Sequence, residues 1–509
     1  MSVLILFAIA LLIRLAIIGV WRFDGLYGQD AFAYYQQALA IAERLPQGLP
    51  PPTDFFWPNG YPLLAALLMT VLGRNESAAQ LTSVLCGAAL APLAYGLSRD
   101  LLGKMGHQVG ILAGLVLAVA GQPVLSSVVI MADMAALFWA MLAAWLLVRS
   151  WRNGRVQQGY LVSAGVALGL AVVTRWLYAL LALPFIAYAL YRAWRTPTPP
   201  HALLAPVLGG FGVLLPQVWL SLHRPEGLMH SWLLNWRPGN AFERQFEHID
   251  GHYSYALPVG LYYLQPLVHP NFMVPLLGLA ALWGIRHLWR ERGSTEAQGA
   301  LILLGGWLGV VYLFLVGIPY ENFRFGLTLY LPAVLLAGAG VEALRTEPPR
   351  FVLRWFKTRQ PSGEGQTIWQ RSVLGVFGVC LLAMALWAGF SAERMLAAHN
   401  QSKTIAHQVA NLVPEDATLL AFGLTLTLQH YTERDVVELY NLHGETLDAA
   451  TASAPVYLLL DLENVAQQWR DRPPALHYEW LRTHRTLTPV ADFPPYSLFL
   501  VSQRDQVVQ

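Results

Sequence analysis

Two aspartates have surroundings that suggest chemistry rather than ordinary surface exposure. Asp30 follows the apolar N-terminal stretch and stands where an N-cap would precede a helix over 31–43. Asp133 lies inside the apolar run 128–148, where an ionised carboxylate is costly unless it meets a polar cavity or a charged partner. Each is either a helix-start carboxylate or a functional group at the membrane surface, and we expect both on the same face.

Two arginines are expected near that face, although the positive-inside rule disfavours basic residues there. Arg175 lies between two apolar runs, and Arg324 lies in a short loop that also carries Glu321. A guanidinium can bind two phosphate oxygens at once, so a lipid phosphate is a suitable ligand, and an ordinary headgroup contact is the alternative. Arg14, in the middle of the first apolar stretch, is expected to pair with a neighbouring helix.

Two histidines have a spacing that metal sites use. His248 and His252 are four residues apart, like a metal pair on one face of a helix. Gly251 weakens a helix there, and the sequence has no His-Glu-x-x-His pattern. We therefore interpret this stretch as a polar substrate loop and predict no metal ligands.

Helices in a membrane must position these side chains. Hydrophobic residues make up 55% of the 509 residues and charged residues only 13%, against about 25% charged in ordinary globular domains. This composition excludes a disordered chain and a soluble nucleic-acid binder, and a net charge of +2 creates no strong field for a polyanion. The apolar runs long enough to cross a bilayer number about eleven: 2–21, 77–98, 108–124, 128–148, 158–174, 176–191, 203–222, 271–288, 299–318, 325–344 and 371–390.

The distribution of charge divides the chain into a membrane domain at 1–391 and a smaller domain at 392–509. In the first domain, basic residues gather in alternate loops, including the basic loop 345–371, so the N terminus and these loops are predicted to be cytoplasmic. The loops at 22–60 and 223–270 then face outward. An odd number of spans places the C-terminal domain outside as well.

The C-terminal domain has the composition of a water-soluble α/β fold. Short β-rich runs predict strands at 418–423, 436–441, 455–461 and 496–502, and 465–482 has a helical pattern. No glycine-rich phosphate loop is evident in it. The predicted fold class is an α-helical polytopic membrane protein with a small extracytoplasmic α/β domain.

Several short segments, in this order, resemble the integral-membrane glycosyltransferases of the GT-C superfamily. They are Asp30-Ala-Phe-Ala-Tyr34-Tyr35 after the first span, the stretch from Tyr61-Pro62 to Gly103, Ala132-Asp133-Met, the Thr174-Arg175 step, and the run from Arg324 to Pro332. The resemblance is strongest over residues 1–200. It points to the bacterial branch that includes lipid A aminoarabinose transferases and protein O-mannosyltransferase-like enzymes.

The resemblance implies a transferase that moves a sugar from a polyprenyl-phosphate donor to an acceptor hydroxyl, by inverting displacement, on the outer face of a bacterial inner membrane. Asp30 would be the general base, and Arg175 and Arg324 would stabilise the leaving phosphate. Asp133 would be a second catalytic residue that orients the acceptor or the loop, or helps to hold a divalent cation. The further substrate-binding candidates are Tyr34, Tyr35, Asn59 and Glu321.

Two positions depart from the pattern of these relatives. Ala31 follows Asp30, where protein mannosyltransferases commonly have a glutamate. Asn59 and Gly60 stand where aminoarabinose transferases have a Glu-Lys pair. The identity of the sugar, and of an acceptor that is a glycan, a lipid or a protein, therefore stays open.

Other classes of membrane protein make different predictions. A lipid or solute transporter would show duplicated halves with broken helices near the midplane, and we find no such repeat in the sequence. A membrane glycan polymerase or ligase is usually organised around a large late outer loop, to which 223–270 would correspond. A structural protein that has lost the chemistry is the remaining alternative.

Overall fold

The computed structural model describes residues 2–152, 154–222, 235–348, 363–451 and 455–503, so parts of the expected loops 223–270 and 345–371 lie outside the described residues. The chain forms two compact units. The membrane unit comprises Met1–Gly25, Tyr34–Ala241 and Val259–Glu393, and the α/β unit comprises Leu26–Ala33, Phe242–Pro258 and Arg394–Gln509. The predicted boundary at 391/392 lies inside one helix, α18 (Gly363–Leu412).

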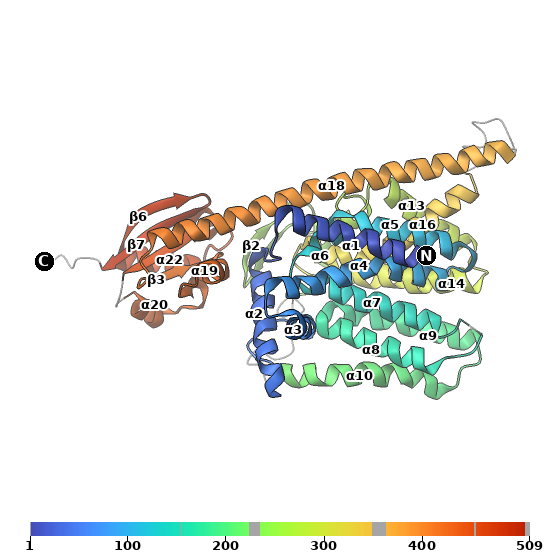
Figure 1. Cartoon of the computed structure of the whole chain (residues 1–509), viewed down its shortest axis with the longest axis horizontal. Helices are drawn as coiled ribbons and strands as arrows, with labels where there is room; N and C mark the ends of the chain where they lie inside the picture. The colour runs from blue at the N-terminus through green and yellow to red at the C-terminus, as the bar shows by residue number, and fades with distance from the viewer. Residues whose placement is uncertain (1, 153, 223–234, 349–362, 452–454, 504–509) are drawn as a thin grey trace. The chain divides into compact units, whose positions relative to one another are not determined.

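The membrane unit is built from helices that pack side by side (Figure 1). Helix α8 (Gln158–Thr174) contacts both α7 (Ala132–Arg149) and α10 (Pro200–Leu222). Helix α13 (Pro275–Arg290) contacts α16 (Gly326–Thr346). The other helices are α1 (Ser2–Trp21), α3 (Gly60–Leu72), α4 (Glu76–Leu101), α5 (Gly106–Val119), α6 (Gly121–Val128), α9 (Ala182–Arg195), α12 (Val259–Tyr262), α14 (Thr295–Ala300) and α15 (Gly306–Leu315), while α2 (Gly28–Arg44) contributes to both units.

Within the described residues, eight helices are long and apolar enough to cross a bilayer, and one bent pair of shorter helices would make nine. The expected count of eleven spans is therefore not confirmed. The expected span 108–124 is divided between α5 and α6, which are bent by 57° relative to each other. The expected spans 158–174 and 271–288 correspond to α8 and α13, which have only 17 and 16 residues.

Glycines allow α13 and α16 to approach backbone to backbone. A Cβ added at Gly340 would overlap the carbonyl oxygen of Ala280, and one added at Gly284 would overlap that of Leu336. Small residues at helix contacts are the usual means of close packing in membranes, where burial of apolar surface gives no driving force between helices. These two glycines therefore fix the distance between α13 and α16.

The bend between α5 and α6 is stabilised from two sides. The fully buried Arg14 of α1 donates from Nη1 to the Ala118 carbonyl at 3.3 Å and from Nη2 to the Leu117 carbonyl at 3.5 Å. In a straight helix the N–H of Gln122 would donate to Ala118, but here it donates to the Asn271 carbonyl at 2.6 Å. Arg14 thus bonds to a neighbouring helix, as expected from its position in the sequence.

The α/β unit contains a five-stranded sheet in the order β4-β3-β5-β7-β6. Its strands are β3 (Thr418–Ala421), β4 (Val436–Glu438), β5 (Val456–Asp461), β6 (Arg485–Phe493) and β7 (Tyr496–Gln503). Strands β4, β3 and β5 are parallel, and β7 is antiparallel to both β5 and β6. The four predicted strands are confirmed, while the sequence pattern does not predict β6, an edge strand that carries Pro489 and is mostly exposed.

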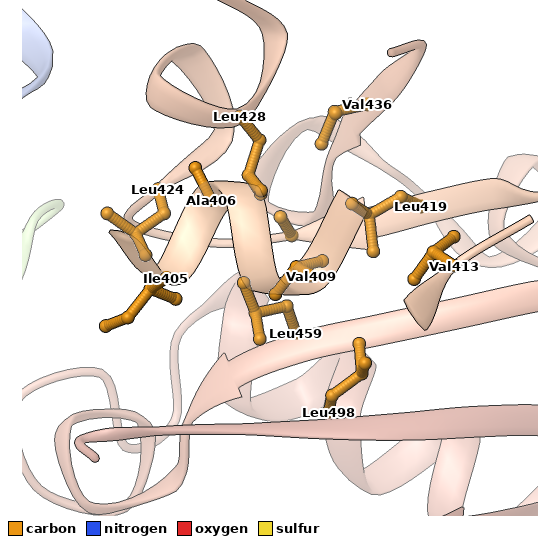
Figure 2. Packing of buried hydrophobic residues seen from close by; sticks show 11 residues of the cluster. Ile405, Ala406, Val409, Val413, Leu419, Leu424, Leu428, Val436, Leu459 and Leu498 are labelled. Atoms are coloured by element: carbon orange, nitrogen blue, oxygen red, sulfur yellow. The ribbon is translucent and has the colours of Figure 1, made fainter. Parts of the chain in front are cut away.

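Helices complete the α/β unit around this sheet: α19 (Thr425–Thr432), α20 (Gly444–Ala450), α21 (Leu462–Gln467) and α22 (Pro473–His484). The predicted helix 465–482 is therefore interrupted between α21 and α22. The end of α18 packs on the sheet, and Figure 2 shows this core. Ile405 and Val409 of α18 and Val413, just after its end, are buried in one cluster with strand residues Leu419 and Leu459.

The expected polar loop contains a two-stranded hairpin of β1 (Gln245–His248) and β2 (Gly251–Ser254). His248 and His252 therefore lie on strands, and a metal pair on a helix is wrong for this stretch. His252 instead approaches a carboxylate, with its Nδ1 3.1 Å from Oε1 of Glu247. No group of three or more His, Cys, Asp or Glu side chains within the described ranges could hold a metal ion.

Candidate active site

Asp133 lies at the start of α7, and two arginines share its carboxylate. Its side chain is only 2% exposed. Arg175 forms an ion pair with Oδ1 of Asp133, and Nη1 of Arg324 lies 3.8 Å from Oδ2. The structure therefore brings together three of the residues singled out in the sequence, from segments that are far apart in the chain.

The backbone around Arg175 presents its side chain at a helix end. Arg175 ends α8 in an extended conformation, and its N–H donates to the Ala171 carbonyl at 2.8 Å. Its guanidinium lies over the ring of Phe325, 4.8 Å from the ring centroid. This cation–π contact orients the plane of the guanidinium.

Arg324 is fixed by a short 3₁₀ helix, Phe323–Phe325, that leads into α16. The Asn322 side chain accepts from the Arg324 N–H at 3.0 Å and so caps this turn. The hydroxyl of Tyr263 donates to the Tyr320 carbonyl at 2.9 Å and accepts from the Asn322 N–H at 3.3 Å. The guanidinium of Arg324 also contacts the sulfur of Met131, just before α7.

The cluster of Asp133, Arg175 and Arg324 brings two guanidiniums to one carboxylate. The arginine side chains are 22% and 28% exposed, whereas the carboxylate is buried between them. Such an arrangement stabilises the arginines at an otherwise apolar helix end, and guanidinium groups of this kind are suitable ligands for an anion such as phosphate.

The cluster lies at the helix ends opposite the expected cytoplasmic loops. Helix α7 starts beside Asp133 and ends at Arg149, and α16 starts beside Arg324 and ends beside Arg345. The basic loops follow the second of these ends in both helices. The prediction that Asp133, Arg175 and Arg324 share one face is therefore consistent with the course of the helices.

Glu321 lies in the loop that carries Arg324, close to Tyr262. Its Oε1 is buried and accepts no hydrogen bond from the described residues. Burial raises the pKa of its carboxyl to about 7. Glu321 therefore changes charge near neutral pH, unlike an ordinary surface glutamate.

The two predicted tyrosines are buried in the membrane unit. Tyr34 stacks on Trp57, with ring centroids 5.2 Å apart, and meets Phe55 edge to face. Burial and the neighbouring Glu76 raise the pKa of the Tyr35 hydroxyl to about 12. Both side chains thus have protein contacts, and their predicted contact with substrate stays a prediction.

Asn59 and Gly60 are held inside the membrane unit. Oδ1 of Asn59 accepts from Gln37 at 2.8 Å, and the Asn59 N–H donates to Gln217 at 3.0 Å. A Cβ at Gly60 would lie 2.6 Å from the Val173 carbonyl oxygen. The backbone therefore has no room for the lysine that aminoarabinose transferases carry at this point, and substrate binding by Asn59 stays a prediction.

Asp30 belongs to the α/β unit, in the segment Leu26–Ala33. Helix α2 begins at Gly28, so Asp30 lies in its first turn, and the expected N-cap position is wrong. The carboxylate is partly exposed, and a negative charge in a first helical turn is favoured by the helix dipole. Its role as a general base stays a prediction.

Several groups that position Arg175 and Arg324 are not evident from the sequence. Phe325 and Met131 contact the arginines, and Asn322 caps the turn that carries Arg324. Asn322 precedes Arg324 by two residues, so an Asx-type turn was a readable signal. The other contacts join distant segments and leave no local pattern.

A divalent cation does not fit the carboxylate of Asp133. Cation sites of this kind use several oxygen ligands, whereas here two guanidiniums approach the Asp133 carboxylate, and the described residues contain no group of three or more His, Cys, Asp or Glu that could hold a metal ion. The expectation that Asp133 helps to hold a metal therefore finds no support in the chemistry of its neighbours.

The segment 58–219, which includes Asp133 and Arg175, matches the family model described as dolichyl-phosphate-mannose-protein mannosyltransferase. The search of curated proteins gave no significant match. Among solved structures, the chain is similar to ArnT from Cupriavidus metallidurans bound to undecaprenyl phosphate, with a TM-score of 0.65 and 16% identity over 98% of this chain and 97% of that one.

A second group of similar structures is archaeal. The Archaeoglobus fulgidus oligosaccharyltransferase tethered to an acceptor peptide has a TM-score of 0.56 and 11% identity, over 100% of this chain and 74% of that one. The archaeal oligosaccharyltransferase AglB from Archaeoglobus fulgidus, in complex with an inhibitory peptide and a dolichol-phosphate, gives a TM-score of 0.54 and 12% identity, over 100% and 75% of the two chains. The oligosaccharyltransferase of the first of these structures is also solved as a complex with Zn and sulfate.

The similarity to these solved structures extends over nearly the whole chain. This chain has the GT-C fold of integral-membrane glycosyltransferases, and the fold predicted from its sequence is confirmed. The architecture predicted with it, an α-helical multi-pass membrane protein with a C-terminal α/β region, is confirmed as well.

Proposed function

We propose that this protein transfers a sugar from a polyprenyl-phosphate donor to an acceptor hydroxyl on the outer face of a bacterial inner membrane. The observation that carries the proposal is the cluster of Asp133, Arg175 and Arg324, which places two guanidiniums at the helix ends opposite the basic loops. A protein of the same fold has been solved with undecaprenyl phosphate bound. The positive-inside rule then favours a cytoplasmic N terminus and an outward-facing site.

The arginines suit a donor whose leaving group is a phosphate. As the bond between the anomeric carbon and the phosphate oxygen breaks, that oxygen gains negative charge. Arg175 and Arg324 would stabilise it through charged hydrogen bonds that strengthen in the transition state. Asp133 would hold both guanidiniums in place and would not itself react.

The acceptor oxygen must lose its proton while it attacks the anomeric carbon from the opposite side. We assign this proton to the carboxylate of Asp30, which acts as the general base. The new bond joins the acceptor oxygen to the anomeric carbon, the released phosphate keeps the electrons of the broken bond, and the configuration inverts. Tyr34, Tyr35, Asn59 and Glu321 are retained as candidates for contact with the sugar or the acceptor.

The test compares cell-envelope glycans from a strain that lacks the gene with those from strains that express the wild type or Asp30→Asn. Mass spectrometry should detect a sugar modification that the wild type restores and Asp30→Asn does not, because an amide cannot take the proton; loss of a general base typically costs about 10²- to 10⁴-fold in rate. The matched control is Asp435→Asn, an exposed aspartate of the same unit.

Membrane levels of the three proteins must be equal for the comparison to hold. Restoration of the modification by Asp30→Asn at the wild-type rate would contradict the assignment of the base. The absence of any glycan difference between the deleted and complemented strains would contradict sugar transfer itself.

A further inference from the structure

The short helix α19 in the α/β unit begins without a side-chain cap of its own. Its N-cap residue is Leu424, which has no side-chain oxygen to offer. The N–H groups of a first helical turn have no partner within the helix, and leaving one unsatisfied when buried is costly. A group from elsewhere in the unit must therefore accept from the start of α19.

Gln29, the residue before Asp30, provides that group. Its Oε1 accepts from the N–H of Leu426 at 3.0 Å, and its Nε2 donates to Oγ1 of Thr427 at 3.0 Å. Both halves of the amide are used, so the side chain of Gln29 has one orientation. Thr427 is only 3% exposed, which protects this pair of hydrogen bonds from competing water.

The residues that follow Asp30 are attached to the same helix. Phe32 is 2% exposed and meets the rings of His430 and Tyr431 edge to face, at centroid distances of 5.4 and 5.8 Å. Asp30 itself is partly exposed between these two attachments. Polar contacts at Gln29 and aromatic contacts at Phe32 therefore fix the backbone on both sides of the carboxylate.

We propose that the α/β unit positions Asp30, and that Gln29 is the positioning residue through its bonds to Leu426 and Thr427. This inference rests on the proposed function, in which Asp30 is the general base. It assigns a role to a domain whose sequence contains no catalytic cluster. Rate depends steeply on the position of a reacting group, and a displacement of about 1 Å can cost 10²-fold.

The inference predicts a loss of turnover without a loss of donor binding. Gln29→Ala removes both hydrogen bonds, and Thr427→Val removes one of them while it keeps the shape of the side chain. In purified protein, both should lower kcat by about 10- to 100-fold and leave KM for the polyprenyl-phosphate donor within about twofold, because the arginines that bind phosphate are untouched. Thr427→Ser restores the hydroxyl and should restore kcat.

The matched control is Gln467→Ala, an exposed glutamine of the same unit whose amide donates to Glu463 at 3.1 Å. A second readout does not depend on activity. Amide hydrogen exchange of residues 28–33 should be faster in Gln29→Ala and Thr427→Val than in the wild type, while exchange in β3, β5 and β7 stays unchanged. Because Gln29→Ala already removes both hydrogen bonds, the double variant with Thr427→Val should have the same kcat as Gln29→Ala alone.

The outcomes separate this inference from the proposed function. If Asp30→Asn is inactive but Gln29→Ala has wild-type kcat and wild-type exchange at 28–33, the positioning role is overturned and the general base stands. If Asp30→Asn is fully active, the proposed function and the positioning of a base both fall. A Thr427→Ser variant as impaired as Thr427→Val would also contradict the role of the hydroxyl.

Discussion

At the scale of single residues, the environment of Asp133 explains how a carboxylate persists at an apolar helix start. A buried charge without a partner is unstable, and here two arginines from other segments supply the partner. The sequence suggested all three residues because each carries a charge where apolar residues dominate. Their mutual pairing could not be predicted, because residues 133, 175 and 324 are joined only through the packing of α7, α8 and α16.

Asp133→Asn should destabilise the protein, because it removes the buried carboxylate that both Arg175 and Arg324 approach. We expect the free energy of unfolding to fall by an amount on the order of 3 kcal/mol, which is typical when one partner of a buried ion pair is removed. Thermal unfolding in detergent measures it, with the exposed Asp54→Asn as control. An unchanged midpoint in Asp133→Asn would show that the carboxylate does not hold the arginines.

The raised pKa of the Glu321 carboxyl predicts that the stability of the protein depends on pH. Its folded-state pKa of about 7 lies above the ordinary glutamate value, so between these two values the folded protein binds more protons at Glu321 than the unfolded chain does. Stability should therefore fall as pH rises through this window. Glu321→Gln should lose the part of this fall in stability that comes from the titration of Glu321. Thermal midpoints of the two proteins between pH 5 and pH 8, a range of about three pH units, measure the difference. Identical curves for the two proteins would contradict the raised pKa.

At the scale of elements, the long apolar helices and the short β-rich strands could be predicted from the sequence. The breaks within the helices could not. The break between α5 and α6 depends on Arg14 and Asn271, which are remote in sequence from the bend. Strand β6 was missed because an exposed edge strand lacks the alternating apolar pattern on which the prediction relies. The start of α2 was misplaced because Gly28 and Gln29 join the helix ahead of Asp30.

The close contact of α13 and α16 predicts a sharp cost for one added methyl group. Gly340→Ala would place a Cβ against the Ala280 carbonyl, so the two helices must move apart. Overpacking of this kind lowers the free energy of unfolding by about 1–3 kcal/mol. Gly378→Ala in α18, where a Cβ meets nothing within 4 Å, is the matched control and should be neutral or slightly stabilising. Equal thermal midpoints for the two variants would contradict backbone contact between α13 and α16.

At the scale of the whole molecule, composition and charge distribution were enough to predict a multi-pass membrane protein with an α/β domain. The short motifs were enough to predict the GT-C fold, which the similarity to solved structures confirms. They were not enough to predict that residues 26–33 and 242–258 join the C-terminal domain in one compact unit. That association depends on side-chain contacts such as those of Gln29 and Phe32, which have no signature in the local sequence.

The binding of the donor phosphate by Arg175 and Arg324 is the central claim, and a cryo-electron microscopy map of the protein with undecaprenyl phosphate tests it most directly. The account predicts phosphate density within hydrogen-bonding distance of both guanidiniums, and loss of that density in the Arg175→Ala, Arg324→Ala double variant. The exposed Arg74→Ala should retain it. Phosphate density at the opposite helix ends, beside Arg149 or Arg345, would contradict both the site and the proposed orientation in the membrane.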